Sequence, residues 1–471
     1  MSSFFGFGFR FTSPFSYLRK LLGIDGKRRR SRGAPPARKP GRRCFTFDHL
    51  ETRLAPAIGV SFSAGTLTLF GTPSDDNVSV LASSTNVTVS VNNVLQTTVS
   101  SANYNNLTAI NFNGNGHTVG DNLTVSGLAG SVAIGLTNVA GLAITSAANV
   151  TVTDTVALAL GTSTLTGNLS VTANGAISQT GTVIDPGTTT LAAGAANNIT
   201  LSTGTNAFGT VVITSGNNVT LADTHAIILG ASTVSGNLSV TANGAITQSG
   251  AVSVAGTGKI ATLAAGSANN ITLSTGTNAF GTVVISSGND VTLADTHALI
   301  LGASTVSGNL SVTANGAITQ SGTVSDPGTT TLAAGSANNI TLSTGTNAFG
   351  TVVITSGNNV TLADTNPIIL GTSTVTGNLS VTANGAITQT GTVSDPGTTT
   401  LAAGSGNNIT LSTGTNAFGT VVISSGNDVT LADTHALILG ASTVTGNLSV
   451  TANGAISQTG TVSDPGTTTL A

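Results

Sequence analysis

One unit of about 69 residues repeats through most of this chain and constrains its fold more than any other feature. It is clearest at residues 308–376, which read GNLSVTANGAITQSGTVSDPGTTTLAAGSANNITLSTGTNAFGTVVITSGNNVTLADTNPIILGTSTVT. A fixed period of this size is typical of repeat architectures, in which each unit packs mainly against its neighbours. The steps between copies are equal except for the second, which is three positions longer, and the copies begin at Gly167, Gly236, Gly308, Gly377 and Gly446.

Within each unit a four-residue phrase recurs, in which an Asn is followed by apolar residues that alternate with Ser or Thr. It occurs at Asn198–Leu201, Asn218–Leu221 and Asn237–Val240. Alternation with period two places both apolar side chains on one face of a β-strand and the hydroxyl on the other. Gly and Asn tolerate left-handed backbone, so we expect the Gly and Asn residues that precede the phrases to form tight corners.

The spacing of the phrases predicts how the strands are arranged. The steps from Ile199 to Val219 and from Val219 to Leu238 are both about 20 residues. The first step is one position longer than the second. Strands of one pattern at this spacing predict an all-β fold, a parallel β-solenoid whose coils stack at about 4.8 Å. We expect about three coils in each unit, with about 23 residues a coil, and about 18 coils in a rod roughly 85 Å long.

The longest coil of each unit contains the stretch SGTVSDPGTTTLAAG, in which Asp-Pro-Gly predicts a turn. The single change of length in the array falls here, because Ala251–Gly266 differs in sequence from the other copies and is three residues longer. Insertions are tolerated in surface loops, so we expect this stretch to project from the coil instead of stacking as a strand.

The positions of the repeats divide the chain into four regions. Residues 1–57 form a basic leader that we expect to be disordered, and residues 58–120 form an irregular, β-rich entry segment. Residues 121–166 hold a degenerate solenoid repeat, and residues 167–471 hold the regular repeats, of which the last is truncated. The array stops inside a repeat without a polar capping segment. Natural solenoids cap their ends, so we expect either a fragment of a longer product or an end that another subunit covers, with end-to-end self-association.

The net charge of −3 conceals a sharp division along the chain. Thirteen of the fourteen Lys and Arg residues lie in residues 1–53, whereas Lys259 is the single base after that point, against fourteen Asp. A weakly acidic array offers little to phosphate groups, so we expect no nucleic-acid partner. No run of eighteen apolar residues occurs, which predicts no transmembrane helix. Cys44 is the only cysteine, so no disulfide forms within the chain.

The leader has two interpretations, a solvated tail and a targeting segment for export. Residues 42–57 read RRCFTFDHLETRLAPA. This stretch resembles the N-terminal motif of large secreted or surface proteins of planctomycete-type bacteria, in which basic residues and an aromatic residue precede Leu-Glu-x-Arg-Leu. The matching residues are Arg42, Arg43, Phe45, Leu50, Glu51, Arg53 and Leu54. The resemblance implies an exported protein with extracellular β-rich repeats.

The array also resembles the β-repeats of filamentous-haemagglutinin-like adhesins and of autotransporter passengers. The phrases that carry this resemblance are GNLSVTANGAITQSG (308–322), NAFGTVVI (347–354) and NNVTLADT (358–365). It implies a secreted or cell-surface scaffold, structural or adhesin-like, whose partners are cell-surface glycans or other envelope proteins. We expect no catalysis, no cofactor and no metal in such a scaffold.

Three patterns are candidates for functional sites. His225, His297 and His435 share one position of the unit, but copies three coils apart lie roughly 14 Å from one another, too far to share a metal. The pair Asp75–Asp76 is similar to part of a calcium-binding repeat, yet the surrounding glycines do not fit, which favours a solvated turn. A recurring Phe in Asn-Ala-Phe-Gly is interpreted as a core residue, with a sugar-stacking stripe as the alternative; it occurs at Phe208, Phe280, Phe349 and Phe418.

Two other classes of function remain as alternatives to the scaffold. The first is a ligand-binding module for ice or glycan, because LSTGT (201–205) and TTTLA (188–192) recur and predict outward hydroxyls. The second is a β-helix enzyme that degrades polysaccharides. Such enzymes gather carboxylates or bases once in a groove, whereas past residue 53 the chain has no Glu or Arg, and the Asp residues of the regular units recur by copying. The enzyme is therefore the weakest of the three hypotheses.

Overall fold

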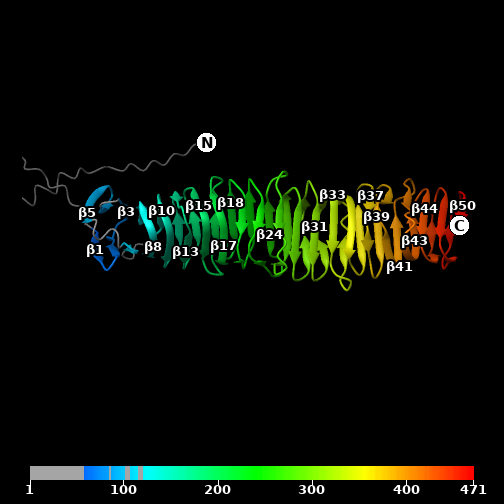
Figure 1. The fold of residues 1–471 in the computed structure, drawn as a ribbon, viewed down its shortest axis with the longest axis horizontal. Helices are drawn as coiled ribbons and strands as arrows, with labels where there is room; N and C mark the ends of the chain where they lie inside the picture. The colour runs from blue at the N-terminus through cyan, green and yellow to red at the C-terminus, as the bar shows by residue number, and fades with distance from the viewer. Residues whose placement is uncertain (1–57, 84–85, 101–106, 115–119) are drawn as a thin grey trace, which may run out of the picture. The chain divides into compact units, whose positions relative to one another are not determined.

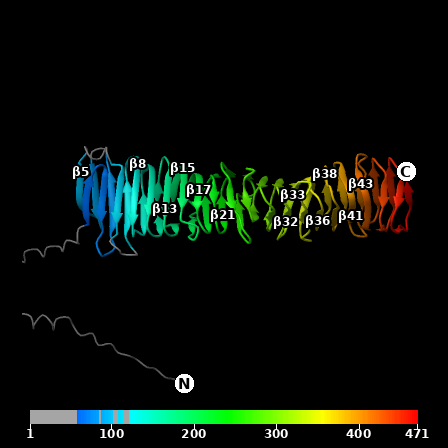
Figure 2. The same cartoon turned by 90° about the horizontal axis from the view of Figure 1, so that it is seen from below.

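A computed structural model describes residues 58–83, 86–100, 107–114 and 120–471. The leader, with Cys44 and the motif at 42–57, lies outside these described residues. The described part is all-β and contains no helix, and its coils stack into one long parallel β-solenoid (Figures 1 and 2). No helix in it is long and apolar enough to cross a membrane. The predicted fold class is confirmed.

The strands are short and run in the following order. Before the first regular unit lie β1 (Gly59–Ser63), β2 (Thr66–Phe70), β3 (Asn77–Ala82), β4 (Asn86–Val91), β5 (Val94–Ser100), β6 (Ala109–Asn113), β7 (Asn122–Ser126), β8 (Leu128–Thr137), β9 (Gly141–Ile144), β10 (Ala147–Asp154), β11 (Leu158–Leu160) and β12 (Ser163–Thr164). The unit from Gly167 holds β13 (Leu169–Ala173), β14 (Ile177–Gln179), β15 (Val183–Ala192), β16 (Ile199–Leu201), β17 (Ala207–Ser215), β18 (Val219–Asp223), β19 (Ile227–Leu229) and β20 (Ser232–Thr233). The unit from Gly236 holds β21 (Leu238–Ala242), β22 (Ile246–Gln248), β23 (Val252–Val254), β24 (Ile260–Ala264), β25 (Ile271–Leu273), β26 (Ala279–Phe280), β27 (Thr282–Ser287), β28 (Val291–Asp295), β29 (Leu299–Leu301) and β30 (Ser304–Thr305).

The later units repeat this order. The unit from Gly308 holds β31 (Leu310–Ala314), β32 (Ile318–Gln320), β33 (Val324–Ala333), β34 (Ile340–Leu342), β35 (Ala348–Ser356), β36 (Val360–Asp364), β37 (Ile368–Leu370) and β38 (Ser373–Thr374). The unit from Gly377 holds β39 (Leu379–Ala383), β40 (Ile387–Gln389), β41 (Val393–Ala402), β42 (Ile409–Leu411), β43 (Ala417–Ser425), β44 (Val429–Asp433), β45 (Leu437–Leu439) and β46 (Ser442–Thr443). The last strands are β47 (Leu448–Ala452), β48 (Ile456–Gln458), β49 (Val462–Ser463) and β50 (Thr468–Leu470).

Two long sheets form the walls of the solenoid, and each turn of the chain adds one strand to both. We call them sheet A, which contains β17 and β19, and sheet B, which contains β16, β18 and β21. The predicted phrases stack in register, with Ile199 opposite Val219 and Val219 opposite Leu238. Their apolar side chains point into the core and their hydroxyls point outward, as the alternation predicts.

Each unit makes three and a half turns, half a turn more than expected. Val211 lies on sheet A, its counterpart Val283 in the next unit lies on sheet B, and Val352 lies on sheet A again. The ladder from β17 to β35 passes through seven pairings, so two units make seven turns of about 20 residues. Equivalent residues of consecutive units therefore face opposite sides of the solenoid.

The Asp-Pro-Gly segment is a corner inside a strand that stacks on the neighbouring coil, so the prediction of a turn that projects from the coil is wrong for three of the four complete units. Strand β33 runs through Asp326 and Pro327 without a break, and a bulge between Asp326 and Thr329 lets it bend. Asp326 is fully buried at this corner. Among the four complete units, only the one with the three extra residues has this strand divided, into β23 and β24, and there the connection Ala255–Gly258 is exposed, as expected for an insertion.

The entry segment begins with antiparallel strands that the repeat does not contain. Strand β1 pairs antiparallel with β2 at the end of sheet A, and β3, β4 and β5 form an antiparallel meander at the end of sheet B. Parallel stacking starts with β6 on β2 and with β7 on β3. These hairpins cover the first parallel strands, and β1 and β5 become the outermost strands of the two sheets.

The core is a stack of aliphatic side chains in which like residues lie over like. Leu238, Val240 and Ile246 are at most 2% exposed, and the recurring Phe residues are 3–4% exposed. The interpretation of Phe208, Phe280, Phe349 and Phe418 as core residues is confirmed. Copying one well-packed coil along the chain builds this core, because each coil meets the same neighbours above and below.

The Asn residues at the start of the strands form hydrogen-bonded ladders and do not adopt left-handed backbone, which corrects the expected role of Asn. The expectation holds for Gly194, which precedes the phrase at Asn198 and has a φ of 83°. The side-chain oxygen of Asn198 accepts the N–H of Asn218 at 3.1 Å, and the side-chain oxygen of Asn218 accepts the N–H of Asn237 at 2.9 Å. Gly236 has no positive φ either; a Cβ there would lie 2.5 Å from the Asn218 side-chain oxygen. Close approach of neighbouring coils, and not backbone handedness, requires this Gly.

A buried pair of Asn and Gln side chains links neighbouring coils by hydrogen bonds in each complete unit. The Asn206 side chain is fully buried; its oxygen accepts N–H groups from Gln179 and Val183, both at 2.9 Å. Its NH₂ donates to the Gln179 side-chain oxygen and to the carbonyls of Leu201 and Ala222. The same pair recurs as Gln248–Asn278, Gln320–Asn347 and Gln389–Asn416. Because all of these polar atoms are bonded, their hydrogen bonds offset the cost of burying them, and the pair fixes the register of the coils.

The two faces of strand β21 predict opposite effects of the same substitution. Leu238→Asp places an unpaired charge in the core and is expected to destabilise its coils by several kcal/mol. The neighbouring Ser239→Asp points outward and is expected to be nearly neutral. Amide hydrogen exchange in β18 and β21 measures both. Equal loss of protection in the two variants would contradict the assigned faces.

Candidate functional site

The buried carboxylates of the array accept hydrogen bonds from backbone N–H groups. Asp223 ends β18, is 3% exposed, and accepts the N–H of Phe208 with one oxygen and the N–H of His225 with the other, both at 2.6 Å. Asp185 accepts the Thr189 hydroxyl at 2.6 Å as well as two N–H groups. Burial raises the pKa of both carboxyls above the usual value, and the hydrogen bonds oppose that rise. Asp223 and its copies hold one corner together in each complete unit, whereas the counterpart of Asp185 is Val254 in the unit from Gly236.

Asp154 departs from this pattern. It occupies the position of Asp223 one unit earlier and is 5% exposed, but only one of its oxygens is bonded, to the N–H of Val156 at 3.1 Å. The other oxygen is buried and has no hydrogen-bond partner in the part of the chain that the structure describes. Burial raises the pKa of Asp154 to about 6, so this carboxyl takes up a proton at a higher pH than an exposed Asp does.

The structure separates the three histidines further than the sequence predicts. Because equivalent corners alternate, the turn with His225 runs from sheet B to sheet A, whereas the turns with His297 and His435 run from sheet A to sheet B. His297 and His435 are seven turns apart on the same edge, about 34 Å by the strand spacing. Their rings are 73% exposed and lie 3.9 and 4.0 Å from the preceding Asp. The prediction that they do not share a site agrees with this arrangement.

Asp75 and Asp76 differ in their exposure to solvent. Asp75 is exposed, as a solvated turn predicts, but Asp76 is 2% exposed and accepts the N–H of Thr72 at 2.7 Å and its hydroxyl at 3.0 Å. The prediction of a solvated turn is therefore wrong for Asp76, which closes a buried turn. Among the residues that the structure describes, no group of three or more His, Cys, Asp or Glu is placed to hold a metal ion.

The hydroxyls of the array form ladders along both sheets, in positions that partly differ from the predicted motifs. LSTGT (201–205) leaves the sheet after Leu201 and forms a turn. In TTTLA (188–192) Thr189 is fully buried against Asp185, and only its neighbours point outward. The continuous ladder uses the middle residue of the strands instead, and on sheet B it runs through Ile300, Thr319, Thr341, Thr361, Ser380, Thr400 and Val422.

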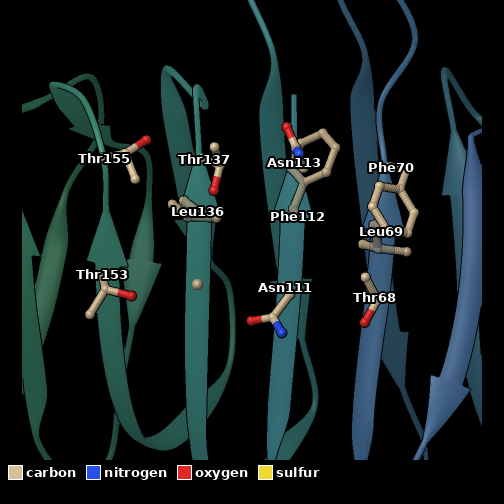
Figure 3. Close-up of a pocket in the computed structure, with 11 residues that line it drawn as sticks. Thr68, Leu69, Phe70, Asn111, Phe112, Asn113, Leu136, Thr137, Thr153 and Thr155 are labelled. Atoms are coloured by element: carbon tan, nitrogen blue, oxygen red, sulfur yellow. The ribbon is translucent and has the colours of Figure 1, made fainter. Parts of the chain in front are cut away.

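A depression of about 330 Å³ lies on the outer face of sheet A, across strands β2, β6, β8 and β10 (Figure 3). Its outward side chains form two rows that follow the register of the strands. Phe70, Asn113, Thr137 and Thr155 make one row, and Thr68, Asn111, Gly135 and Thr153 make the other. All of these residues are uncharged.

Phe70 and Asn111 distinguish the depression from the rest of the wall. Phe70 is 52% exposed, and it is the one aromatic side chain among the described residues that stands among the exposed large hydrophobic groups. Asn111 is exposed, and within the described part of the chain its amide makes no hydrogen bond, unlike the Asn residues of the ladders. Gly135 leaves room beside it, because a Cβ there would lie 2.6 Å from the Asn111 side-chain oxygen.

Sequence reasoning missed this depression, although one signal was present. In Thr66–Phe70 the alternation that buries Leu67 and Leu69 requires Phe70 to point outward. The neighbours of Phe70 come from three separate segments further along the chain, at Asn113, Thr137 and Thr155. Their adjacency depends on the stacking of irregular coils, which no fixed period predicts.

Fold and surface together define a repeat protein of the parallel β-solenoid class. The model of a family described as repeats of unknown function (DUF5649) matches five consecutive segments, 147–215, 216–287, 288–356, 357–425 and 426–471. The matched segments cover more than half of the chain, which therefore belongs to this family. The first match starts before Gly167 and so includes part of the degenerate repeat. The comparisons with curated proteins and with solved structures found no match.

The contrast between Asp154 and Asp223 predicts opposite effects of one substitution. A carboxyl whose pKa is raised on folding loses stability as pH rises from its unfolded value near 4 through its folded value, about 6 for Asp154. Asp154→Asn removes that loss and is expected to stabilise β10 at pH 7 by up to roughly 3 kcal/mol, with little effect at pH 4.

The matched control is Asp223→Asn, which turns an NH₂ group toward an N–H donor because both Asp223 oxygens accept hydrogen bonds. We expect it to destabilise the array at pH 7. Hydrogen exchange of amides in β10 and β18 measures each variant locally. Stabilisation by both substitutions, or a gain at Asp154 that does not change with pH, would contradict this account.

Proposed function

We propose that this protein is a non-catalytic scaffold, structural or adhesin-like, outside the cell or on its surface. The observation that carries the proposal is the use of the recurring polar groups of the array. The buried Asp223 and Asn206 and the Asn198 ladder bind the backbone of neighbouring coils, in copies through several units. Groups that rigidify a wall in every copy support the role of a stiff spacer that presents other parts of the molecule at a distance.

Catalysis receives no comparable support. A hydrolase or lyase requires a unique set of acid and base groups around a cleft. The raised pKa values of Asp185, Asp326 and Asp395 resemble those of catalytic acids, but these residues are equivalent by copying and each is fully buried within a corner. Such perturbed values also occur in structural sites.

A second candidate function is ligand binding by the hydroxyl ladders. The ladder between Ile300 and Val422 holds five consecutive hydroxyls spaced by one strand separation. The ladder is interrupted by Val and Ile in each unit, where the register also moves sideways. Thermal hysteresis of the purified chain tests ice binding, for which an uninterrupted flat row would be the more suitable surface.

Location is the decisive test of the scaffold proposal. Lys259 is the single lysine of the array and lies next to the exposed loop Ala255–Gly258. Intact cells that carry the gene are treated with a membrane-impermeant, amine-reactive biotin, and labelling of Lys259 is measured. We expect labelling before lysis, and its loss in the matched variant Lys259→Arg. Labelling of Lys259 only after lysis would contradict a surface or secreted location.

A further inference from the structure

We propose that the depression over β2, β6, β8 and β10 binds a neutral oligosaccharide, with Phe70 stacked against a sugar ring and Asn111 hydrogen-bonded to sugar hydroxyls. The proposal rests on the adhesin-like function and deepens it by naming a ligand class and a site. It is supported by the shape of the surface, the exposure of one aromatic ring and the absence of charge in the lining.

The exposed ring is open on its flank. Phe70 is 52% exposed and pairs with Gly59 on β1, which carries no side chain; a Cβ there would lie 3.4 Å from the ring. An apolar group that covers this ring would gain free energy by removing apolar surface from water. The C–H face of a sugar ring is flat, apolar and of matching size, whereas the hydroxyls at its rim remain free for hydrogen bonds.

The polar groups beside the ring suit those hydroxyls. The Asn111 amide offers two donors and an acceptor with no partner among the described residues, and Thr68 and Thr153 lie on either side of it in the same row. Across four strands the row extends about 14 Å, which suits a short oligosaccharide better than a single sugar. A few convergent polar groups next to an apolar surface are the usual composition of a small-molecule site.

The lack of charge excludes the obvious competitors. None of the residues that line the depression is basic or acidic. A nucleic-acid strand stacks its bases on aromatic rings, but its affinity depends on basic residues that neutralise phosphate. Lys259, the single base after residue 53, lies in β-strand connections of the later array and not in this lining. A neutral ligand is therefore favoured.

The test uses the purified full chain and isothermal titration calorimetry. The probes are hexasaccharides of β-1,4-glucan, β-1,3-glucan, α-1,4-glucan and β-1,4-linked N-acetylglucosamine, followed by an array of neutral glycans. We expect binding to at least one neutral glycan, and a loss of affinity of at least about tenfold in Phe70→Ala. Gly135→Ala, which pushes the Asn111 amide from its place, is expected to weaken binding as well.

The matched control is Ile228→Ala, which removes another exposed apolar side chain, 38% exposed, from sheet A. We expect its affinity to equal that of the wild type, and circular dichroism to show that all variants keep their β structure. Three outcomes would overturn the proposal: no neutral glycan binds, binding is unchanged in Phe70→Ala, or single-stranded polyuridylate binds more tightly than any glycan. Because the measurement uses purified chain, it is independent of the labelling of Lys259 on cells.

Discussion

The parallel, in-register stacking of one coil on the next is the constraint on which the structure depends. Each backbone N–H and C=O of a strand bonds to the coil above or below, and a slip of one residue would turn every core side chain to the outside. Buried polar groups enforce the register: Asn206 bonds Gln179 and the backbone of neighbouring coils, and Asp223 ties β18 to the N–H of Phe208. A chain under this constraint must present a compatible residue about every 20 positions, and copying one unit satisfies it.

The half turn in each unit determines what the surface repeats. Because Val211 and Val283 lie on different sheets, every surface motif appears on both sides of the solenoid and returns to the same side only after seven turns. The same offset places His225 and His297 on opposite edges. Two copies of the unit thus produce two similar faces, each with its own hydroxyl ladder.

Features that occur once lie where the repeat is imperfect. Before Gly167 lie the antiparallel hairpins, the exposed Phe70, the Asn111 amide and Asp154; among the described residues, that amide has no hydrogen-bond partner and only one Asp154 oxygen has one. In the regular units the buried Asp, Asn and Ser side chains are hydrogen-bonded in the same way in successive copies, which leaves little variation for a specific site. Identical coils give the solenoid stiffness and length. A specific binding site requires residues that differ from those of the repeated unit.

Periodicity alone determined the all-β class, the parallel solenoid and the inward face of each strand, because period-two alternation and a fixed repeat are properties of the chain itself. The sequence favoured a buried Phe208 but left a sugar-stacking stripe open, and the structure decided for burial. Only the tertiary structure decided the half turn, because it depends on how many strands fit around the coil. It also decided the corner at Asp326, where burial and a bulge replace the expected turn, and the contacts of Asn198 with the next coil. The depression at Phe70 required the structure most of all, since its residues meet through irregular coils of unequal length.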